Sequence, residues 1–156
     1  MIIIRKAKHS DMKLYFNWAN DKAVRDNSFH SEPISLDSHR TWFKNKLNDN
    51  SSFLYVAKNN NIPIGQIRFQ IDDNHTAELS FSLKKEARGR GLGKQILKLA
   101  IEKLSNDCSK VASIKAHVKK TNISSNKIFT QLDFNIDEKH QSESAVTYQL
   151  QLPRRR

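Results

Sequence analysis

Residues 77–104 read AELSFSLKKEARGRGLGKQILKLAIEKL. The segment opens with a predicted strand, Ala77 to Leu83, and ends with the clearest helix signal in the chain. That helix begins near Gly91, and its apolar residues recur with the spacing of one buried helix face. They are Leu92, Ile96, Leu97, Ala100 and Leu104. The segment therefore predicts a strand, a glycine-rich turn and a helix in direct succession.

The turn Arg88-Gly89-Arg90-Gly91-Leu92-Gly93 is the strongest candidate for an anion site. The first N–H groups of a helix lack intrahelical partners and carry about half a positive charge. Glycine has no Cβ, so a phosphate can approach the backbone closely at residues 89, 91 and 93. Basic side chains crowd around the turn and add attraction: Lys84, Lys85, Arg88, Arg90 and Lys94. We therefore expect a bound phosphate or diphosphate here, with a plain helix cap as the alternative.

Two other phosphate loops do not match this spacing. A nucleotide-triphosphate loop needs Gly-Lys-Ser/Thr, which the turn lacks. A dinucleotide fingerprint needs G-x-G-x-x-G after the first strand of a βαβ unit, whereas this turn follows a late strand and its glycines alternate.

The remaining pattern predicts a mixed α/β fold with a predominantly antiparallel central sheet flanked by helices. Asn59-Asn60-Asn61 and Asp72-Asp73-Asn74 suit tight turns, which indicates an antiparallel meander before the glycine-rich turn. Strands are expected at residues 1–6, 53–58, 64–71, 77–83, 111–118, 134–137 and 145–152. Helices are expected at residues 11–20 with Ser10 as cap, 36–47 with Ser35 as cap, 91–104 and 124–132. Residues 21–33 are a polar connection.

Arg88-x-x-Gly91-x-Gly93 at this place resembles the acetyl-CoA-binding turn of the GNAT acetyltransferase superfamily. After the next strand, Asn122-x-x-Ser125-x-x-x-Phe129-x-x-x-Asp133-Phe134 follows in the order that this family shows. The resemblance covers nearly the whole chain. It implies one domain of the acyl-CoA N-acyltransferase-like fold over residues 1–152, with a basic tail at 153–156.

The resemblance also implies an enzyme that transfers acetyl from acetyl-CoA to a primary amine by direct attack on the thioester. Pantetheine would pair as an added strand with Phe81, Ser82 and Leu83. The pyrophosphate would lie on Arg88, Gly89, Arg90, Gly91, Leu92, Gly93 and Lys94. Asn122 and Ser125 would flank the pantetheine arm, and Ser125 is also a catalytic candidate. The alternatives are an ordinary turn residue for Asn122 and a helix cap for Ser125.

Two positions depart from the family pattern. Many relatives carry tyrosine where this chain has Phe129, whose ring cannot donate a proton to the departing thiolate. A thiol with a pKa of about 8.5 leaves tolerably without that help. Asp133 stands where glycine is usual, and we expect it to adopt a left-handed turn.

The acceptor amine must be neutral to attack, which calls for a base. Glu78, in the strand beside the acetyl group, is the first candidate. A surface glutamate paired with a lysine is the alternative. His30, His39 and His75 could also serve near neutral pH.

The first third of the chain is expected to form the acceptor side. Trp18-x-Asn20-Asp21-x-x-x-Arg25, Ser28-Phe29 and His39-x-x-Trp42-Phe43 resemble the GNAT branch that acetylates nucleotide-linked deoxy amino sugars, including those of pseudaminic acid pathways. Trp42 or Phe29 could stack on a base or sugar, and Arg25 could hold a diphosphate. The expected substrate-binding residues are Asn20, Arg25, Phe29, His30, His39 and Trp42. Trp18 and Phe43 are expected in the core.

The formal net charge of +11 favours an anionic partner. A nucleotide-linked amino sugar fits, while a protein N-terminus or another small amine is the rival acceptor. A nucleic-acid-binding module and a catalytically inert CoA-binding module are the alternatives from other classes. The apolar start ends at Arg5 and Cys108 is the single cysteine, which indicates a cytoplasmic protein without a membrane partner or a metal. A homodimer could form through a sheet edge near residues 145–152.

Overall fold

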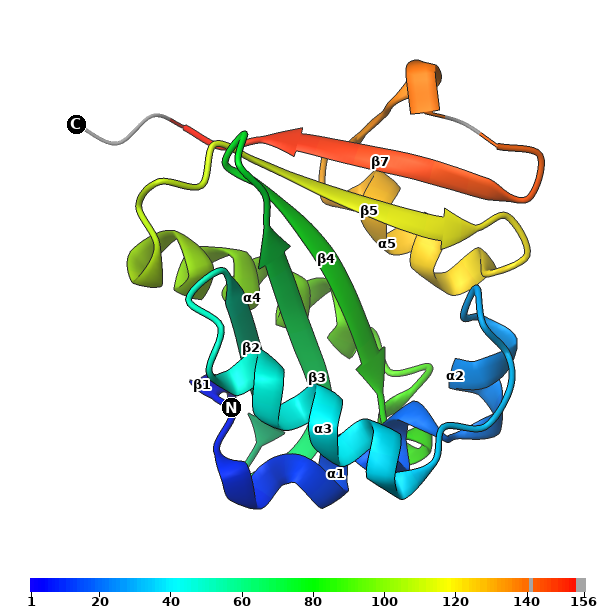
Figure 1. The fold of residues 1–156 in the computed structure, drawn as a ribbon. Coiled ribbons are helices and arrows are strands. Elements are labelled where there is room, and N and C mark those ends of the chain that lie inside the picture. Colours follow the sequence, from blue (N-terminus) through cyan, green and yellow to red (C-terminus); the bar gives the residue numbers. More distant parts are fainter. Residues whose placement is uncertain (141, 154–156) are drawn as a thin grey trace.

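The computed structural model describes residues 1–140 and 142–153, and it shows a seven-stranded sheet with helices on both faces (Figure 1). The strand order is β1-β2-β3-β4-β5-β7-β6, and every neighbouring pair is antiparallel except β4 and β5. The strands are β1 (Ile2–Lys6), β2 (Ser52–Asn59), β3 (Ile62–Ile71), β4 (Thr76–Leu83), β5 (Ser113–Lys119), β6 (Asn135–Ile136) and β7 (Ala145–Gln151). The predicted mixed α/β fold is confirmed.

Five α-helices and three short 3-10 turns connect these strands in the described residues. The helices are α1 (Met12–Ala19), α2 (Lys22–Asp26), α3 (Leu36–Leu47), α4 (Leu92–Asp107) and α5 (Ile123–Gln131). The 3-10 turns are η1 (His9–Asp11), η2 (Lys85–Ala87) and η3 (Glu138–His140). No helix in this described part is long and apolar enough to cross a membrane.

The sheet separates two apolar clusters. The larger one buries the predicted face of α4 against the sheet, and Phe129 of α5 belongs to the same cluster. The smaller one lies under α1 and α3, where Tyr15, Trp18 and Phe43 meet Leu54 and Val56 of β2. The core positions expected for Trp18 and Phe43 are therefore confirmed. On the α1 and α3 side of the sheet, the polar side chains of β3 and β4 lie beside the smaller cluster.

One predicted helix cap is confirmed, one is wrong, and one short helix was not predicted. Ser35 caps α3 as predicted, since its hydroxyl accepts from the Ser38 N–H at 3.2 Å. Ser10 does not cap α1, because the chain first makes η1 and the N-cap residue is Asp11. The polar connection at 21–33 contains the unpredicted helix α2, which is too short for a periodic signal; the Asp21 carboxylate caps it.

The C-terminal edge of the sheet is partly covered. β7 lies between β5 and the two-residue strand β6, which pairs only with Gln149 and Tyr148, so the edge expected for a dimer is covered at those two residues and the dimer stays a prediction. Asp133 has φ 65°, the left-handed conformation expected where relatives carry glycine. The basic tail at 154–156 lies outside the described residues.

Candidate active site

A groove opens where β4 and β5 stop pairing. These parallel strands are paired only from Thr76 to Glu78 on β4 and from Ser113 to Lys115 on β5. Beyond that point they diverge, and β5 runs away from β4 beside β7 (Figure 1). This region contains a cavity of about 1080 Å³. Its walls are formed by residues of β3, β4, β5 and α5, by the start of α4 and by the segment from α1 to α3. This size suits a ligand of several linked groups.

The N-terminus of α4 borders this groove. Gly91 is its N-cap residue with φ 72°, Gly89 has φ 75°, and no side chain caps the helix. A Cβ added at either glycine would meet nothing within 4 Å, so the left-handed backbone, not lack of space, calls for glycine. The first amides of α4 are thus left for an outside acceptor. Of the residues predicted to bind the diphosphate, all but Arg90 line the cavity.

Gly93 has a different structural reason. A Cβ there would stand 2.7 Å from Cδ1 of Ile128, inside the contact between α4 and α5. Gly93 is buried, so its lack of a side chain lets the two helices approach. The sequence interpretation assigned this glycine to phosphate access alone and missed its packing role.

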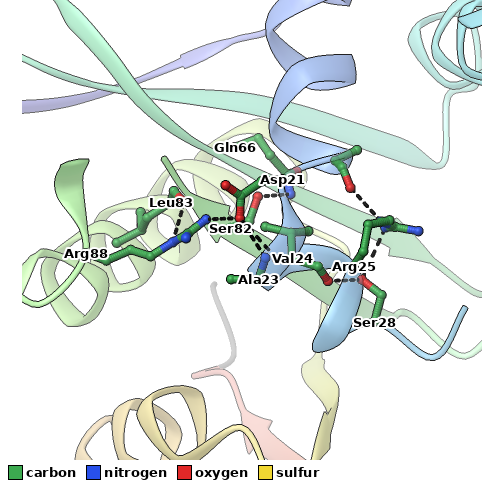
Figure 2. A network of polar contacts seen from close by, with 10 residues as sticks. Asp21, Ala23, Val24, Arg25, Ser28, Gln66, Ser82, Leu83 and Arg88 are labelled. Atoms are coloured by element: carbon green, nitrogen blue, oxygen red, sulfur yellow. Dashed lines mark hydrogen bonds and ion pairs between the residues drawn. The ribbon is translucent and has the colours of Figure 1, made fainter. Parts of the chain in front are cut away.

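Arg88 ties the turn to the residue that caps α2. Its Nε donates to the Leu83 carbonyl at 3.1 Å and its terminal N–H to Oδ1 of Asp21 at 2.7 Å (Figure 2). Burial acts to raise the pKa of Asp21, but the hydrogen bonds from Arg88 and the Val24 N–H outweigh it and hold the pKa below its usual range. One side of the Arg88 guanidinium is therefore committed to the cap of α2.

The start of α5 forms the opposite wall. Asn122 and Ser125 both line the cavity, as the resemblance implied. Asn122 is also the N-cap residue of α5, because its Oδ1 accepts from the Ser125 N–H at 3.3 Å. Of the two alternatives, the capping role thus falls to Asn122 and not to Ser125.

Phe129 reaches the cavity from within an aromatic cluster. Its ring stacks on Tyr148 with centroids 5.2 Å apart and meets Phe134 and Phe81 edge-on at 5.0 and 6.1 Å. The side chain is almost fully buried. It shapes the wall and has no proton to donate.

Glu78 and His117 come together where β4 and β5 part. Nε2 of His117 lies 3.6 Å from Oε1 of Glu78, and its Nδ1 lies 2.8 Å from the Thr147 hydroxyl. That hydroxyl donates to the His140 carbonyl at 3.0 Å, so it accepts from the imidazole. The proton is thereby fixed on Nδ1, and Nε2 is directed at Glu78. His117 lines the cavity, whereas Glu78 is not among the lining residues but lies beside His117 and is about half exposed.

The sequence interpretation overlooked His117. Alternation along the predicted strand 111–118 places His117 on the same face as Lys115. The sequence does not show how this strand is aligned with the strand that carries Glu78, so the contact between His117 and Glu78 could not be predicted. Glu78 faces this imidazole, and no lysine lies within salt-bridge distance of it in the part of the chain that the structure describes.

The three histidines considered as bases lie in different surroundings. His39 is buried between aromatic rings, its Nε2 contacts the Met12 carbonyl at 3.2 Å, and burial lowers the pKa of its imidazole. It lines the cavity mainly as a packing residue. His75 lies in the turn between β3 and β4, away from the residues that line the cavity. His30 lines the cavity on its exposed loop.

Asn20 and Arg25 hold the loop that follows α2. The Asn20 amide makes paired hydrogen bonds with the backbone of Ile34 at 2.7 and 2.9 Å. The Arg25 guanidinium donates to the carbonyls of Ala19 and His30 at 2.6 and 2.8 Å. It also donates to the Ser28 hydroxyl at 3.2 Å (Figure 2). Most of its N–H groups are used within the protein, although Arg25 still lines the cavity.

Trp42 and Phe29 line the same end of the cavity. Phe29 is more than half exposed and keeps a ring face for a ligand. Trp42 already carries the Arg68 guanidinium over its ring at 5.0 Å. The sequence interpretation did not single out Arg68, which lies on β3 and lines the cavity.

Comparisons with known proteins agree with this geometry. The sequence model of the family described as "Acetyltransferase (GNAT) domain" matches residues 1–135. No curated protein matches the chain by sequence. Among solved structures, a spermidine N-acetyltransferase from Vibrio cholerae in complex with CoA and spermine has a TM-score of 0.85 at 18% identity, over 96% of this chain and 95% of that one.

Two other solved structures show the same fold. A ribosomal L7/L12 alpha-N-protein acetyltransferase in complex with coenzyme A has a TM-score of 0.82 at 14% identity, over 97% of this chain and 94% of that one. An aminoglycoside acetyltransferase in complex with coenzyme A has a TM-score of 0.81 at 16% identity, over 97% and 95%.

The family match spans most of the sequence. The chain belongs to the GNAT acetyltransferase family. It is an N-acetyltransferase that uses acetyl-CoA as its acetyl donor.

Proposed function

We propose that the unpaired edge of β4 and the N-terminus of α4 hold acetyl-CoA. Phe81, Ser82 and Leu83 lie on the part of β4 that β5 leaves open, which suits an extended amide-bearing arm. The amides at Gly91 and beyond, with Lys94 nearby, suit the pyrophosphate. Acetyl-CoA supplies an activated acetyl thioester when bound.

The acceptor in this proposal is the amine of a nucleotide-linked deoxy amino sugar. The charge of the cavity away from the α4 turn supports it. Arg88 and Lys94 lie at that turn, and of the other lining residues Arg25, Arg68 and Lys127 are basic while only Glu32 is acidic. Spermidine and aminoglycosides, which name two of the structural neighbours, are polycations. A polycation would meet like charge here, whereas a nucleotide-linked sugar brings phosphates.

Glu78 and His117 prepare the amine. An ammonium group has no lone pair, so it must lose a proton before it can accept an acetyl group. Nε2 of His117 and the Glu78 carboxylate lie side by side at the point where β4 and β5 begin to separate. We assign the proton to this pair, with Thr147 fixing the orientation of the imidazole.

A panel of acceptors tests the proposal. We would measure thiol release from acetyl-CoA with amino nucleotide sugars, spermidine and a peptide with a free N-terminus, and identify each product by mass. Amino nucleotide sugars should react, and Glu78→Gln should abolish turnover while coenzyme A binding stays intact. Glu138→Gln, on exposed η3, is the matched control and should behave as wild type. Preference for spermidine or the peptide would overturn the acceptor assignment.

A further inference from the structure

Arg68 is a largely buried cation without an anionic partner. It projects from the middle of β3 and lines the cavity, with Trp42 under its guanidinium. Among the described residues, no carboxylate lies within salt-bridge distance of it, and its guanidinium has no hydrogen bond to protein. Arg5 and Arg88, by contrast, each pair with an aspartate at 2.7 Å. Burial is the main reason that the pKa of Arg68 is lowered; the charge of Arg25 acts in the same direction, while Tyr15 and Glu78 oppose it.

A second polar group beside Arg68 is also incomplete. Gln66 is two residues away on β3, on the same face, and it lines the same cavity. Its Nε2 donates to the Ser82 hydroxyl at 3.1 Å, but its Oε1 is buried with no hydrogen-bond partner. Figure 2 shows Gln66 next to Ser82. A buried charge and a buried carbonyl oxygen without partners are costly unless a ligand completes both.

The register of the sheet places these groups relative to the proposed base. Arg68 lies opposite Ser80, so Glu78 is its diagonal neighbour on the same face. The two side chains leave the sheet roughly 7 to 8 Å apart. They form no ion pair with each other among the described residues, and the Arg68 guanidinium lies at Trp42 instead. A ligand that contacts both therefore offers them separate groups, an anion to Arg68 and an amine to Glu78.

We propose that Arg68 and Gln66 form a subsite for the sugar-phosphate end of the acceptor. Arg68 donates to the phosphate oxygens through its planar fork, and Gln66 accepts a hydrogen bond from a sugar hydroxyl. This assignment rests on the proposed acceptor class and specifies which group of it is recognised. Arg25, whose donors are largely occupied, holds the surrounding loop instead of the phosphate.

Binding of simple probes tests the subsite without turnover. Protein saturated with coenzyme A, so that the α4 turn is filled, is titrated calorimetrically with glucosamine 1-phosphate and with glucosamine. The wild type should bind the phosphate ester more tightly. Arg68→Met should weaken that binding about 10- to 100-fold, the value of a charged hydrogen-bonded contact, and leave glucosamine unchanged. Arg40→Met, an exposed arginine of α3, is the matched control and should change neither.

Several results would overturn the subsite. They are equal wild-type affinity for the two probes, wild-type affinity of Arg68→Met for the phosphate ester, or an equal loss for both probes. Muramic acid, an amino sugar with a carboxylate, separates the two sources of negative charge, and binding as tight as that of the phosphate ester would contradict the choice of phosphate. Arg68→Lys keeps the charge without the fork; it should show an intermediate loss and provides the answer if Arg68→Met unfolds.

Turnover separates this proposal from the proposed function. If Arg68→Met acetylates amino nucleotide sugars with the wild-type KM, the subsite is wrong and the acceptor class stands. If phosphate-dependent binding requires Arg68 but no amino nucleotide sugar is acetylated, the subsite stands and the acceptor class is wrong.

Discussion

Replacement of Gly93 by alanine should destabilise the fold through a clash with Ile128, and shortening Ile128 to valine should remove that clash. The new Cβ would lie 2.7 Å from Cδ1 of Ile128, so that side chain must move at a cost of roughly 1–3 kcal/mol. Alanine within a helix recovers about 0.5–1 kcal/mol relative to glycine. Gly93→Ala should therefore lower the free energy of unfolding by about 1 kcal/mol. Ile128→Val removes Cδ1, and in that background Gly93→Ala should stabilise by about 0.5 kcal/mol.

Urea unfolding of the wild type, both single variants and the double variant gives the coupling energy directly. The same four proteins are then titrated with coenzyme A. Because the Cβ would point at Ile128 and toward Leu83, the double variant should bind coenzyme A as Ile128→Val does. An equal loss of stability in both backgrounds would refute the packing argument. A loss of coenzyme A affinity that Ile128→Val does not repair would show that a phosphate needs the space.

Three further changes test separate parts of the site and the fold. Gly91→Ala places a Cβ on a residue with φ 72° and should cost roughly 1–2 kcal/mol in urea unfolding; no loss would mean that the left-handed turn is not required. His117→Gln should lower kcat by about 100-fold or more with coenzyme A affinity unchanged, and a wild-type kcat would remove His117 from the proton path. Asp11→Asn should cost about 2–3 kcal/mol near pH 7, because it removes a bidentate partner of Arg5 at 2.7 and 2.9 Å. The hydrogen bond from Arg5 is the main reason that the pKa of Asp11 is lowered, so this cost should be full above about pH 4 and fade as the pH falls further. A cost that stays constant as the pH falls below about 4 would contradict it.

The sequence predicted the parts of the fold that local pattern determines. The start of α4 and the bounds of the meander strands were located within one or two residues, because their periodicity and their Asn and Asp turns are local signals. The helix α4 itself continues to Asp107, beyond the expected end at Leu104. The short helix α2 was missed because five residues give no periodicity. The full strand order was not predicted, because it depends on contacts between distant segments.

The same division holds for the site. Glycines and basic residues indicated the α4 turn, since that motif is contiguous. His117 and Arg68 were not identified, because alternation says only which side of a strand a residue faces. Their surroundings depend on which segments pack against that side: Glu78 lies beside His117, and the Arg68 guanidinium lies over the Trp42 ring. The sequence also did not indicate that Arg25, which lines the cavity as expected, donates most of its N–H groups to its own loop.

The central claim is that the opening between β4 and β5, closed by the N-terminus of α4, binds the acetyl donor. The most direct test is the melting temperature of the protein with and without coenzyme A. A ligand at about 100 times its Kd stabilises the folded state by roughly 2.7 kcal/mol. For a chain of this length that corresponds to a rise of roughly 5 to 11 °C. We predict a rise in this range, and an unchanged melting temperature at saturating coenzyme A would contradict the account.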